Sequence, residues 1–177
     1  MDGDKKLLEP ENRVELLRGW LLHAHKGRDR HDTAARRFEG RRILFGVPAI
    51  VLTAVVGTSV FASIGSDPAV WTRVCVGILS MGAAVLSALQ TFLDYQVRSE
   101  RHRVAAVKYK AIIRELEEVL SAPRQDLAVE PAWLADLQKR LDTLEEEMPV
   151  VAPGIYDDVE RTYANPVFVK TALALYR

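Results

Sequence analysis

The chain has 177 residues, which suits one domain or one membrane hairpin with helices attached to it. Its 24 lysines and arginines balance its 24 aspartates and glutamates, and this neutrality argues against a polycationic nucleic-acid-binding protein. The single cysteine, Cys75, lies in an apolar run and cannot form an intrachain disulfide, so a disulfide-stabilised fold is excluded. The balanced composition hides two long charge-free runs with densely charged flanks.

Residues 1–42 precede the first apolar run and are predicted to contain a helix from Glu11 to about Phe38. Apolar side chains recur in this segment at helical spacing, at Val14, Leu17, Leu21 and Ala24. Such an apolar stripe needs a partner, which is either another helix of the chain or a second subunit.

The first apolar run, residues 43–64, contains no charged side chain. As an α-helix at ~1.5 Å per residue it spans about 33 Å, enough to cross a hydrocarbon core of ~30 Å. Pro48 lies near the start of the run and lacks a backbone N–H, so we expect a helix that starts afresh near Val47. The competing interpretation is a buried hairpin in a soluble bundle, but such helices normally carry a charged stripe, which this run lacks.

The second apolar run, residues 74–93, is also free of charge but less hydrophobic, so we expect it to insert as the return leg of a hairpin. A helical wheel separates its bulky residues from an arc of small and hydroxylated ones, namely Gly77, Ser80, Ala84, Ser87 and Thr91. Two interpretations of this arc remain open. It packs against Gly46, Thr53 and Gly57 of the first run, or it lines a water-filled pore in an oligomer.

Basic residues flank both runs, whereas the short joining segment carries only Asp67 and Arg73 as charged residues. Because positive charge is retained in the cytoplasm, we predict a multi-pass protein of the inner (cell) membrane with both termini cytoplasmic. Binding of anionic lipid or nucleic acid is the alternative role for such a cluster. The residues expected to set the topology are Arg36, Arg37, Arg41, Arg42, Arg98, Arg101 and Arg103.

Residues 94–177 are predicted to form a cytoplasmic helical region. The second membrane helix should continue unbroken from Asp94 to Leu120, because no glycine or proline interrupts it. After a linker from Pro123 to Pro131, residues 131–148 repeat leucines with the spacing of a coiled coil. Residues 149–166 are rich in proline, glycine and tyrosine and are predicted as a loop, and residues 167–176 as a last short helix. The predicted fold is therefore all-α, a two-transmembrane helical hairpin with long cytoplasmic helices forming a helical bundle.

The side chains that enzymes need are not arranged for catalysis along this sequence. The histidines, His23, His25, His31 and His102, form no pair at the i, i+4 spacing of a helical metal site. Ser99, Glu100 and His102 are close in sequence but point in different directions on one helix, so we interpret them as a solvated face. We therefore predict no enzyme, no catalytic residues, no metal and no cofactor.

The organisation of the chain resembles the SLATT superfamily, the two-transmembrane domains associated with SMODS nucleotidyltransferases and SLOG sensors. The resemblance rests on the basic N-terminal helix that leads into FGVPAIVLTAVVGTSVF, on the Leu89-Gln90-Thr91-Phe92 exit, and on Glu100-Arg101-His102 and Lys108-Tyr109 in the long helix that follows. It covers nearly the whole chain. The predicted organisation is a single domain, 1–177, with an N-terminal helix (1–42), membrane helices at 43–64 and 74–93, and a cytoplasmic helical region (94–177).

The resemblance implies a membrane effector of a bacterial, nucleotide-signal-dependent conflict (anti-phage) system. Members of the family are thought to oligomerise and to form a pore or disrupt the inner membrane. The implied partners are membrane lipid, further copies of the chain, and a nucleotidyltransferase, a SLOG-type sensor or another signalling protein, with no nucleic acid. The alternative function is a non-conducting, membrane-anchored helical scaffold or interaction module.

Overall fold

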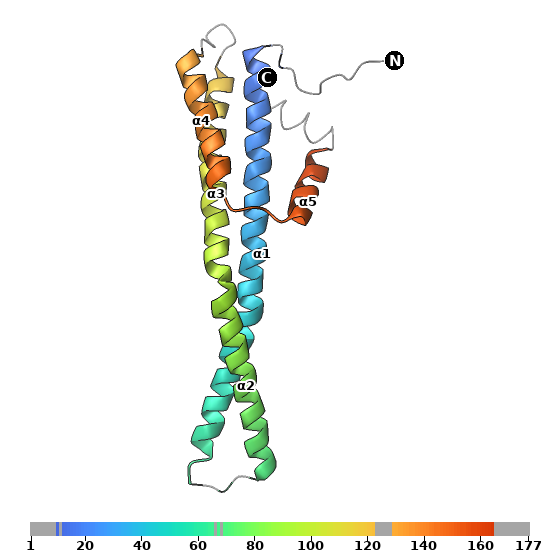
Figure 1. Cartoon of the computed structure of the whole chain (residues 1–177), viewed down its shortest axis with the longest axis vertical. Coiled ribbons are helices and arrows are strands. Elements are labelled where there is room, and N and C mark those ends of the chain that lie inside the picture. The colour runs from blue at the N-terminus through green and yellow to red at the C-terminus, as the bar shows by residue number, and fades with distance from the viewer. Residues whose placement is uncertain (1–9, 11, 66, 68, 123–128, 165–177) are drawn as a thin grey trace, which may run out of the picture. The chain divides into compact units, whose positions relative to one another are not determined.

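A computed structural model describes residues 10, 12–65, 67, 69–122 and 129–164, and all regular structure in these residues is helical (Figure 1). The predicted all-α fold is therefore confirmed. The helices are α1 (Arg13–Ala62), α2 (Val70–Leu93), α3 (Tyr95–Ser121), α4 (Pro131–Glu147) and α5 (Pro153–Tyr163). The chain divides into two compact units. Unit 1 comprises Met1–Ala34 and Arg101–Arg177, and unit 2 comprises Ala35–Glu100.

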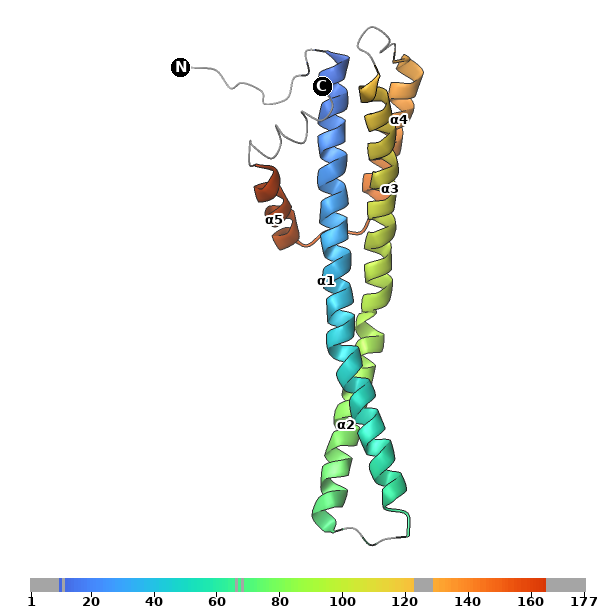
Figure 2. The same cartoon turned by 180° about the vertical axis from the view of Figure 1, so that it is seen from behind.

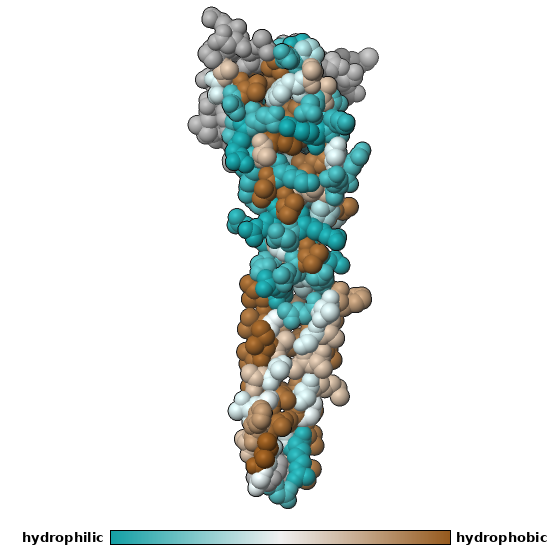
Figure 3. Space-filling view, turned by 90° about the vertical axis from the view of Figure 1, so that its left-hand side faces the viewer, coloured by the Kyte–Doolittle hydropathy of each residue, from teal (hydrophilic) through white to brown (hydrophobic). Residues whose placement is uncertain are grey.

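Unit 2 is a helical hairpin with an apolar surface. Its arms are the second half of α1 and the whole of α2, which cross each other and then spread apart towards the joining segment (Figures 1 and 2). Both apolar runs are long enough to cross a membrane, and 11% and 6% of their most apolar stretches are buried. A core helix of a soluble protein would bury most of such a stretch. The exposed apolar surface, brown and pale in Figure 3, indicates a membrane-associated hairpin.

Helix α1 runs without a break from Arg13 to Ala62, so the predicted new start near Val47 is wrong. Pro48 lies inside this helix. A proline removes one backbone hydrogen bond from a helix interior. On either side of it the buried Gly46 and Ala49 keep α1 packed within unit 2, and this packing offsets the missing bond.

Helix α2 ends at Leu93, so the predicted uninterrupted helix from residue 94 onwards is wrong in this detail. Asp94 adopts a left-handed conformation, with φ 43° and ψ 47°, and α3 begins at the next residue. The Asp94 N–H donates to the Gln90 carbonyl at 3.2 Å, and the Asp94 carbonyl accepts from the Arg98 N–H at 3.1 Å. The interruption is therefore one residue wide.

In unit 1, helices α1, α3 and α4 enclose a single hydrophobic core. Leu17 and Leu21 of α1, Leu116 of α3 and Leu137 of α4 are almost completely buried in it. These positions belong to the apolar stripes that the sequence shows, and the prediction of a helix over residues 131–148 is confirmed by α4. Burial of one such leucine contributes roughly 1.5–3 kcal/mol, so this core is the main stabilising element of unit 1.

Helix α5 lies within the segment that was predicted as a loop, and that prediction is wrong. Pro153 occupies the first turn, where its missing N–H is tolerated. Ile155, Val159 and Tyr163 then recur every four residues and are buried. The proline, glycine and tyrosine content of the segment concealed this stripe. The predicted short helix at 167–176 and most of the predicted linker at 123–131 lie outside the described residues.

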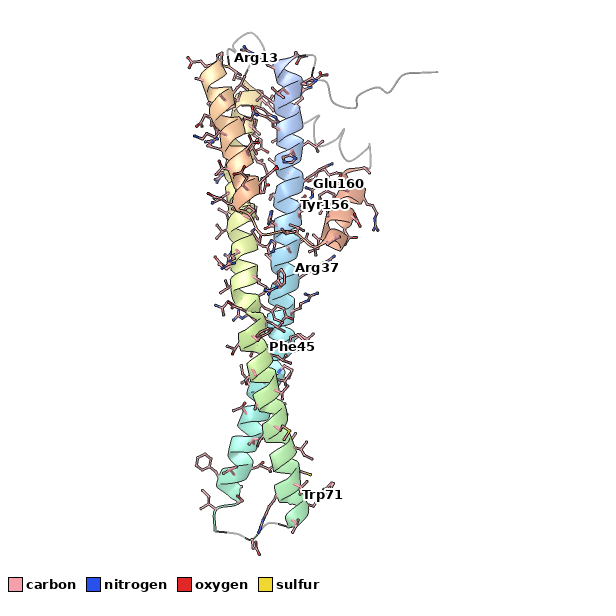
Figure 4. The ribbon with its side chains drawn as sticks, in the orientation of Figure 1. Arg13, Arg37, Phe45, Trp71, Tyr156 and Glu160 are labelled. Carbon is pink, nitrogen blue, oxygen red and sulfur yellow. The ribbon has the colours of Figure 1, made fainter. Side chains whose placement is uncertain are left out.

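Polar contacts attach α5 to α1. Glu160 accepts a hydrogen bond from Lys26 Nζ at 2.7 Å and forms an ion pair with Arg30. The Lys26 hydrogen bond is the main reason that the pKa of Glu160 is lowered, against an opposing effect of burial. The Arg30 guanidinium also lies 3.8 Å from the centre of the Tyr156 ring. Figure 4 shows Glu160 and Tyr156 on the side of α5 that faces α1.

A buried histidine pair joins α1 to α3 within unit 1. His31 Nδ1 and His102 Nδ1 lie 2.9 Å apart in a hydrogen bond, and the Tyr109 ring stacks on His31 at 5.8 Å between centroids. The prediction that His102 belongs to a solvated face is therefore wrong, because only 3% of this residue is exposed. No local pattern could indicate the pair, since its members are 71 residues apart.

Two glycines of α1 provide a matched test of the packing around Tyr109. A Cβ atom on Gly27 would lie 2.6 Å from Tyr109 Cζ, whereas one on Gly19 would meet nothing within 4 Å. Gly27→Ala should therefore destabilise the protein by about 1–3 kcal/mol. Gly19→Ala should stabilise it by about 0.5–1 kcal/mol through helix propensity. Thermal melting of the detergent-solubilised chain measures both, and equal effects of the two substitutions would contradict the predicted packing.

The histidine pair predicts a stability that depends on pH. The pKa of His31 is lowered from 6.5 to about 4, mainly by burial and further by His102 and Arg30. Between these two values the unfolded chain binds a proton that the folded chain does not, so stability falls as the pH drops from 6.5 towards 4. The full loss corresponds to about 3 kcal/mol. Melting curves across this pH range should show it, and His31→Gln should flatten the dependence.

Candidate functional site

The candidate site lies in unit 2, where one seam holds α1 against α2. We define the seam as the stripe of buried and half-buried residues on each helix that includes Gly46 and Gln90. On α2 these are buried Ala83 and the half-buried Val76, Leu79, Leu86, Gln90 and Leu93. On α1 they are buried Gly46 and Ala49 and the half-buried Phe45, Leu52, Val56, Ser59 and Ser63. Most of these residues recur at alternating spacings of three and four, which is the pattern of a helix face that packs against another helix.

Gly46 is the one of the predicted packing glycines that has a side chain of α2 against it. A Cβ atom there would lie 2.5 Å from Gln90 Nε2 of α2, so the absence of a side chain makes room for the Gln90 amide. Gly57 is half-buried but has open space around it. Thr53 is exposed, and its hydroxyl donates to the Ala49 carbonyl at 2.8 Å. Of the three predicted residues, Gly46 is therefore the one held tightly in the seam.

The small and hydroxylated face of α2 lies beside the seam. Ser80 is half-buried, while Gly77, Ala84, Ser87 and Thr91 are exposed. The Ser80 hydroxyl donates to the Val76 carbonyl at 2.8 Å, and the Thr91 hydroxyl donates to the Ser87 carbonyl at 3.1 Å. Within one chain, most of this face is therefore not covered by α1. Its role as a pore lining or as a packing surface stays a prediction.

An aromatic collar, defined as Phe38, Phe45 and Tyr95, lies next to the left-handed Asp94. The Tyr95 ring is 5.9 Å from that of Phe45 and 6.2 Å from that of Phe38, measured between centroids. Ser99 adds a hydrogen bond from its hydroxyl to the Ala35 carbonyl at 2.9 Å. Sequence reasoning did not single out the collar. Aromatic residues at the ends of apolar runs, which favour the membrane interface, were the signal available.

The basic residues predicted to set the topology are exposed. This holds for Arg36, Arg37, Arg41, Arg42, Arg98, Arg101 and Arg103. Arg42 pairs with Glu39 at 3.0 Å, and the Arg41 guanidinium lies 5.9 Å from the centre of the Phe38 ring. In the joining segment, Asp67 and Arg73 form an ion pair, and Trp71 is exposed at the start of α2 (Figure 4).

The polar side-chain groups of the two apolar runs are hydroxyls, the Gln90 amide and the Cys75 thiol. Residues 43–64 and 74–93 contain no Asp, Glu, Lys, Arg or His. In the part of the chain that the structure describes, no three His, Cys, Asp or Glu side chains gather as a metal site would require. The hairpin therefore offers surfaces for helix packing, lipid and water, and no ionisable relay for protons or charged substrates.

Gly46, which lies in the seam, and Gly57, which has open space around it, should differ in the cost of the same substitution. Gly46→Leu places a large side chain where the Gln90 amide lies, so the Gln90 side chain must move and the leucine must be accommodated beside it, which should lower stability by about 1–3 kcal/mol. Gly57→Leu enters open space and should be tolerated. Melting temperatures of both variants in the same detergent measure the difference. A larger loss for Gly57→Leu than for Gly46→Leu would contradict the seam.

Comparison with protein families agrees with this architecture. A family model described as SMODS and SLOG-associating 2TM effector domain family 4 matches residues 11–174, which is nearly the whole chain. No significant match was found among curated proteins or among solved structures. The family name describes a two-transmembrane effector associated with SMODS and SLOG proteins, in keeping with the hairpin of unit 2. The resemblance inferred from the sequence is confirmed, and the chain belongs to SMODS and SLOG-associating 2TM effector domain family 4.

Proposed function

We propose that this protein is the membrane effector of a bacterial, nucleotide-signal-dependent conflict system, and that it oligomerises and permeabilises the inner membrane. The family match supports the effector role. The two apolar arms of unit 2 support insertion into a bilayer, since both are long enough to cross it and both expose their apolar side chains.

The observation that carries the proposal is the position of the small face of α2 outside the α1–α2 seam. Exposed Gly77, Ala84, Ser87 and Thr91 gain little from contact with lipid chains, whereas bulky Ile78 and Val85 cover more of the helix and suit lipid well. In a bilayer, small residues allow a second helix to approach closely, and hydroxyls can face water in a pore. A second copy of the chain can pack a helix closely against this face, and an oligomer can turn the hydroxyls of the face towards a water-filled pore.

The exposed arginines that flank the hairpin support an orientation with both termini in the cytoplasm. In this orientation the joining segment with Asp67 and Trp71 faces outwards, and the helices of unit 1 meet cytoplasmic partners. A SMODS nucleotidyltransferase or a SLOG-type sensor is the partner class indicated by the family name. The proposed course of activation is that such a partner, or its nucleotide product, acts on unit 1 and releases oligomerisation of unit 2.

A non-conducting scaffold is the second candidate function, and a groove in unit 1 favours it. The groove has a volume of about 410 Å³ and lies between α3 and α4. Ala111, Ile112 and Leu144 contribute apolar lining, and charged residues such as Lys108 and Glu147 surround it. Apolar grooves with charged rims suit helical peptides. This function predicts a soluble partner that copurifies with the chain and no leakage at any oligomer size.

Leakage from liposomes tests the pore proposal. The full chain, reconstituted into liposomes of bacterial lipid that enclose a fluorescent dye, should release the dye. Ser87→Leu fills the small face with a branched apolar side chain and should reduce release to the level of empty liposomes, because close helix packing and the hydroxyl are lost together.

Thr58→Leu is the matched control for this experiment. Thr58 is an exposed hydroxylated residue on the other arm of the hairpin, and its hydroxyl bonds to the Ala54 carbonyl of its own helix at 2.8 Å. This variant should release dye like the unsubstituted chain. Leakage that survives Ser87→Leu would reject the lining assignment, and an unsubstituted chain that never leaks would favour the scaffold.

A further inference from the structure

Asp94 is the one non-glycine residue with positive φ among those that the structure describes. Left-handed backbone is disfavoured for residues with a side chain, although aspartate tolerates it better than most. Residues 91–97 contain no glycine or proline, so nothing in the local sequence prevents one continuous helix from α2 into α3. The left-handed residue is therefore imposed by packing around it.

The inward-facing stripe of α2 does not continue in register into α3. The change occurs at Asp94. In α2 the stripe passes through Ala83, Leu86, Gln90 and Leu93, so an unbroken helix would continue it at positions 97 and 100. Those positions hold Val97 and Glu100, and both are exposed. The residues turned inwards are instead Tyr95 and Ser99, two positions and one position earlier. The left-handed residue thus rotates the start of α3 relative to α2.

Contacts of the aromatic collar stabilise this orientation of the start of α3 towards α1. Tyr95, the residue directly after Asp94, lies between Phe38 and Phe45 of α1, with its ring close to parallel to that of Phe45 at 13°. Ser99 bonds to the Ala35 carbonyl one turn further on. On the other side of Asp94, the Gln90 amide lies over Gly46. Contacts on both sides of the joint therefore oppose the intrinsic preference of residue 94 for right-handed helix.

We propose that Asp94 is a one-residue joint with two states. With Asp94 left-handed, the collar and the α1–α2 seam are made together, as in this structure. With Asp94 right-handed, α2 and α3 form one helix, so the seam and the collar cannot both face α1. While the collar holds, α2 turns about its axis and presents a different face to α1. Such bistable elements are the usual basis of switching in packed proteins.

A label-to-label distance across the two arms tests the joint directly. Phe61 and Trp71 are 76% and 74% exposed, so each accepts a nitroxide after substitution by cysteine in a Cys75→Ser background. The full-length chain is placed in lipid nanodiscs and measured by pulsed electron spin resonance. Asp94→Gly removes the cost of the left-handed state, so the labels at positions 61 and 71 should show a single distance, as in the chain with Asp94. Asp94→Ala favours the continuous helix and should add a second distance, displaced by roughly the ~10 Å diameter of a helix.

Two further variants make the result decisive. Asp142→Ala is the same substitution at an exposed position of α4, and it should leave the distance unchanged. Asp94→Gln keeps a polar side chain at this position but, like alanine, favours the right-handed helix, so it should add the same second distance and serves in place of Asp94→Ala if that variant does not fold. A single, unchanged distance in both Asp94→Ala and Asp94→Gln would overturn the proposal.

The joint itself does not depend on the pore, but its link to activity rests on the function proposed above. If the small face of α2 lines a pore, Asp94→Ala and Asp94→Gly should differ in dye release from liposomes. A second distance without any leakage would support the joint and reject the pore. Leakage that is equal in the two variants, together with one unchanged distance, would reject the joint and keep the pore.

Discussion

The hairpin of unit 2 depends on one constraint, which is that polar groups surrounded by apolar surface must be satisfied within the helix that carries them. The backbone N–H and C=O groups of a helix meet this requirement by bonding to each other. In the hydrocarbon of a bilayer no water is present to bond them instead. The hydroxyls follow the same rule, because Thr53, Thr58, Ser80 and Thr91 each donate to the carbonyl four residues earlier. With these groups satisfied locally, the two arms can associate mainly through the fit of their side chains, and the small residues Gly46, Ala49 and Ala83 leave room for larger neighbours in the seam.

The sequence predicted the parts of the fold that follow from long repeated patterns. Charge-free runs predicted the hairpin, and apolar stripes such as Leu134–Leu144 predicted helices that share a core. The pairing of His31 with His102 could not be predicted, since no local pattern links residues so far apart. In the candidate site, the wheel of α2 separated small from bulky residues. It could not show that most of the small face lies outside the seam, because the partner helix and its phase come from tertiary packing.

Pro48 and Asp94 show why local rules failed at two points of the hairpin. The rules place a break at the proline and none at the aspartate, and the structure has the reverse. At Pro48 the loss is a single hydrogen bond, and buried neighbours on both sides keep the helix packed. At Asp94 an unbroken helix would be locally favourable, but it would turn Tyr95 away from Phe38 and Phe45. In both cases the preference of one residue is overruled by contacts with the opposite helix.

Helix α5 differs from the rest of unit 1 in how it is attached. Its buried residues, Ile155, Val159 and Tyr163, do not belong to the core that α1, α3 and α4 share. It can therefore detach while that core stays intact, and its contacts through Glu160 are of the kind that dissolved salt weakens. Such elements open locally far more often than the whole domain unfolds. We therefore expect α5 to open before the core that α1, α3 and α4 share, which would expose its segment to proteolysis while the rest of unit 1 stays folded.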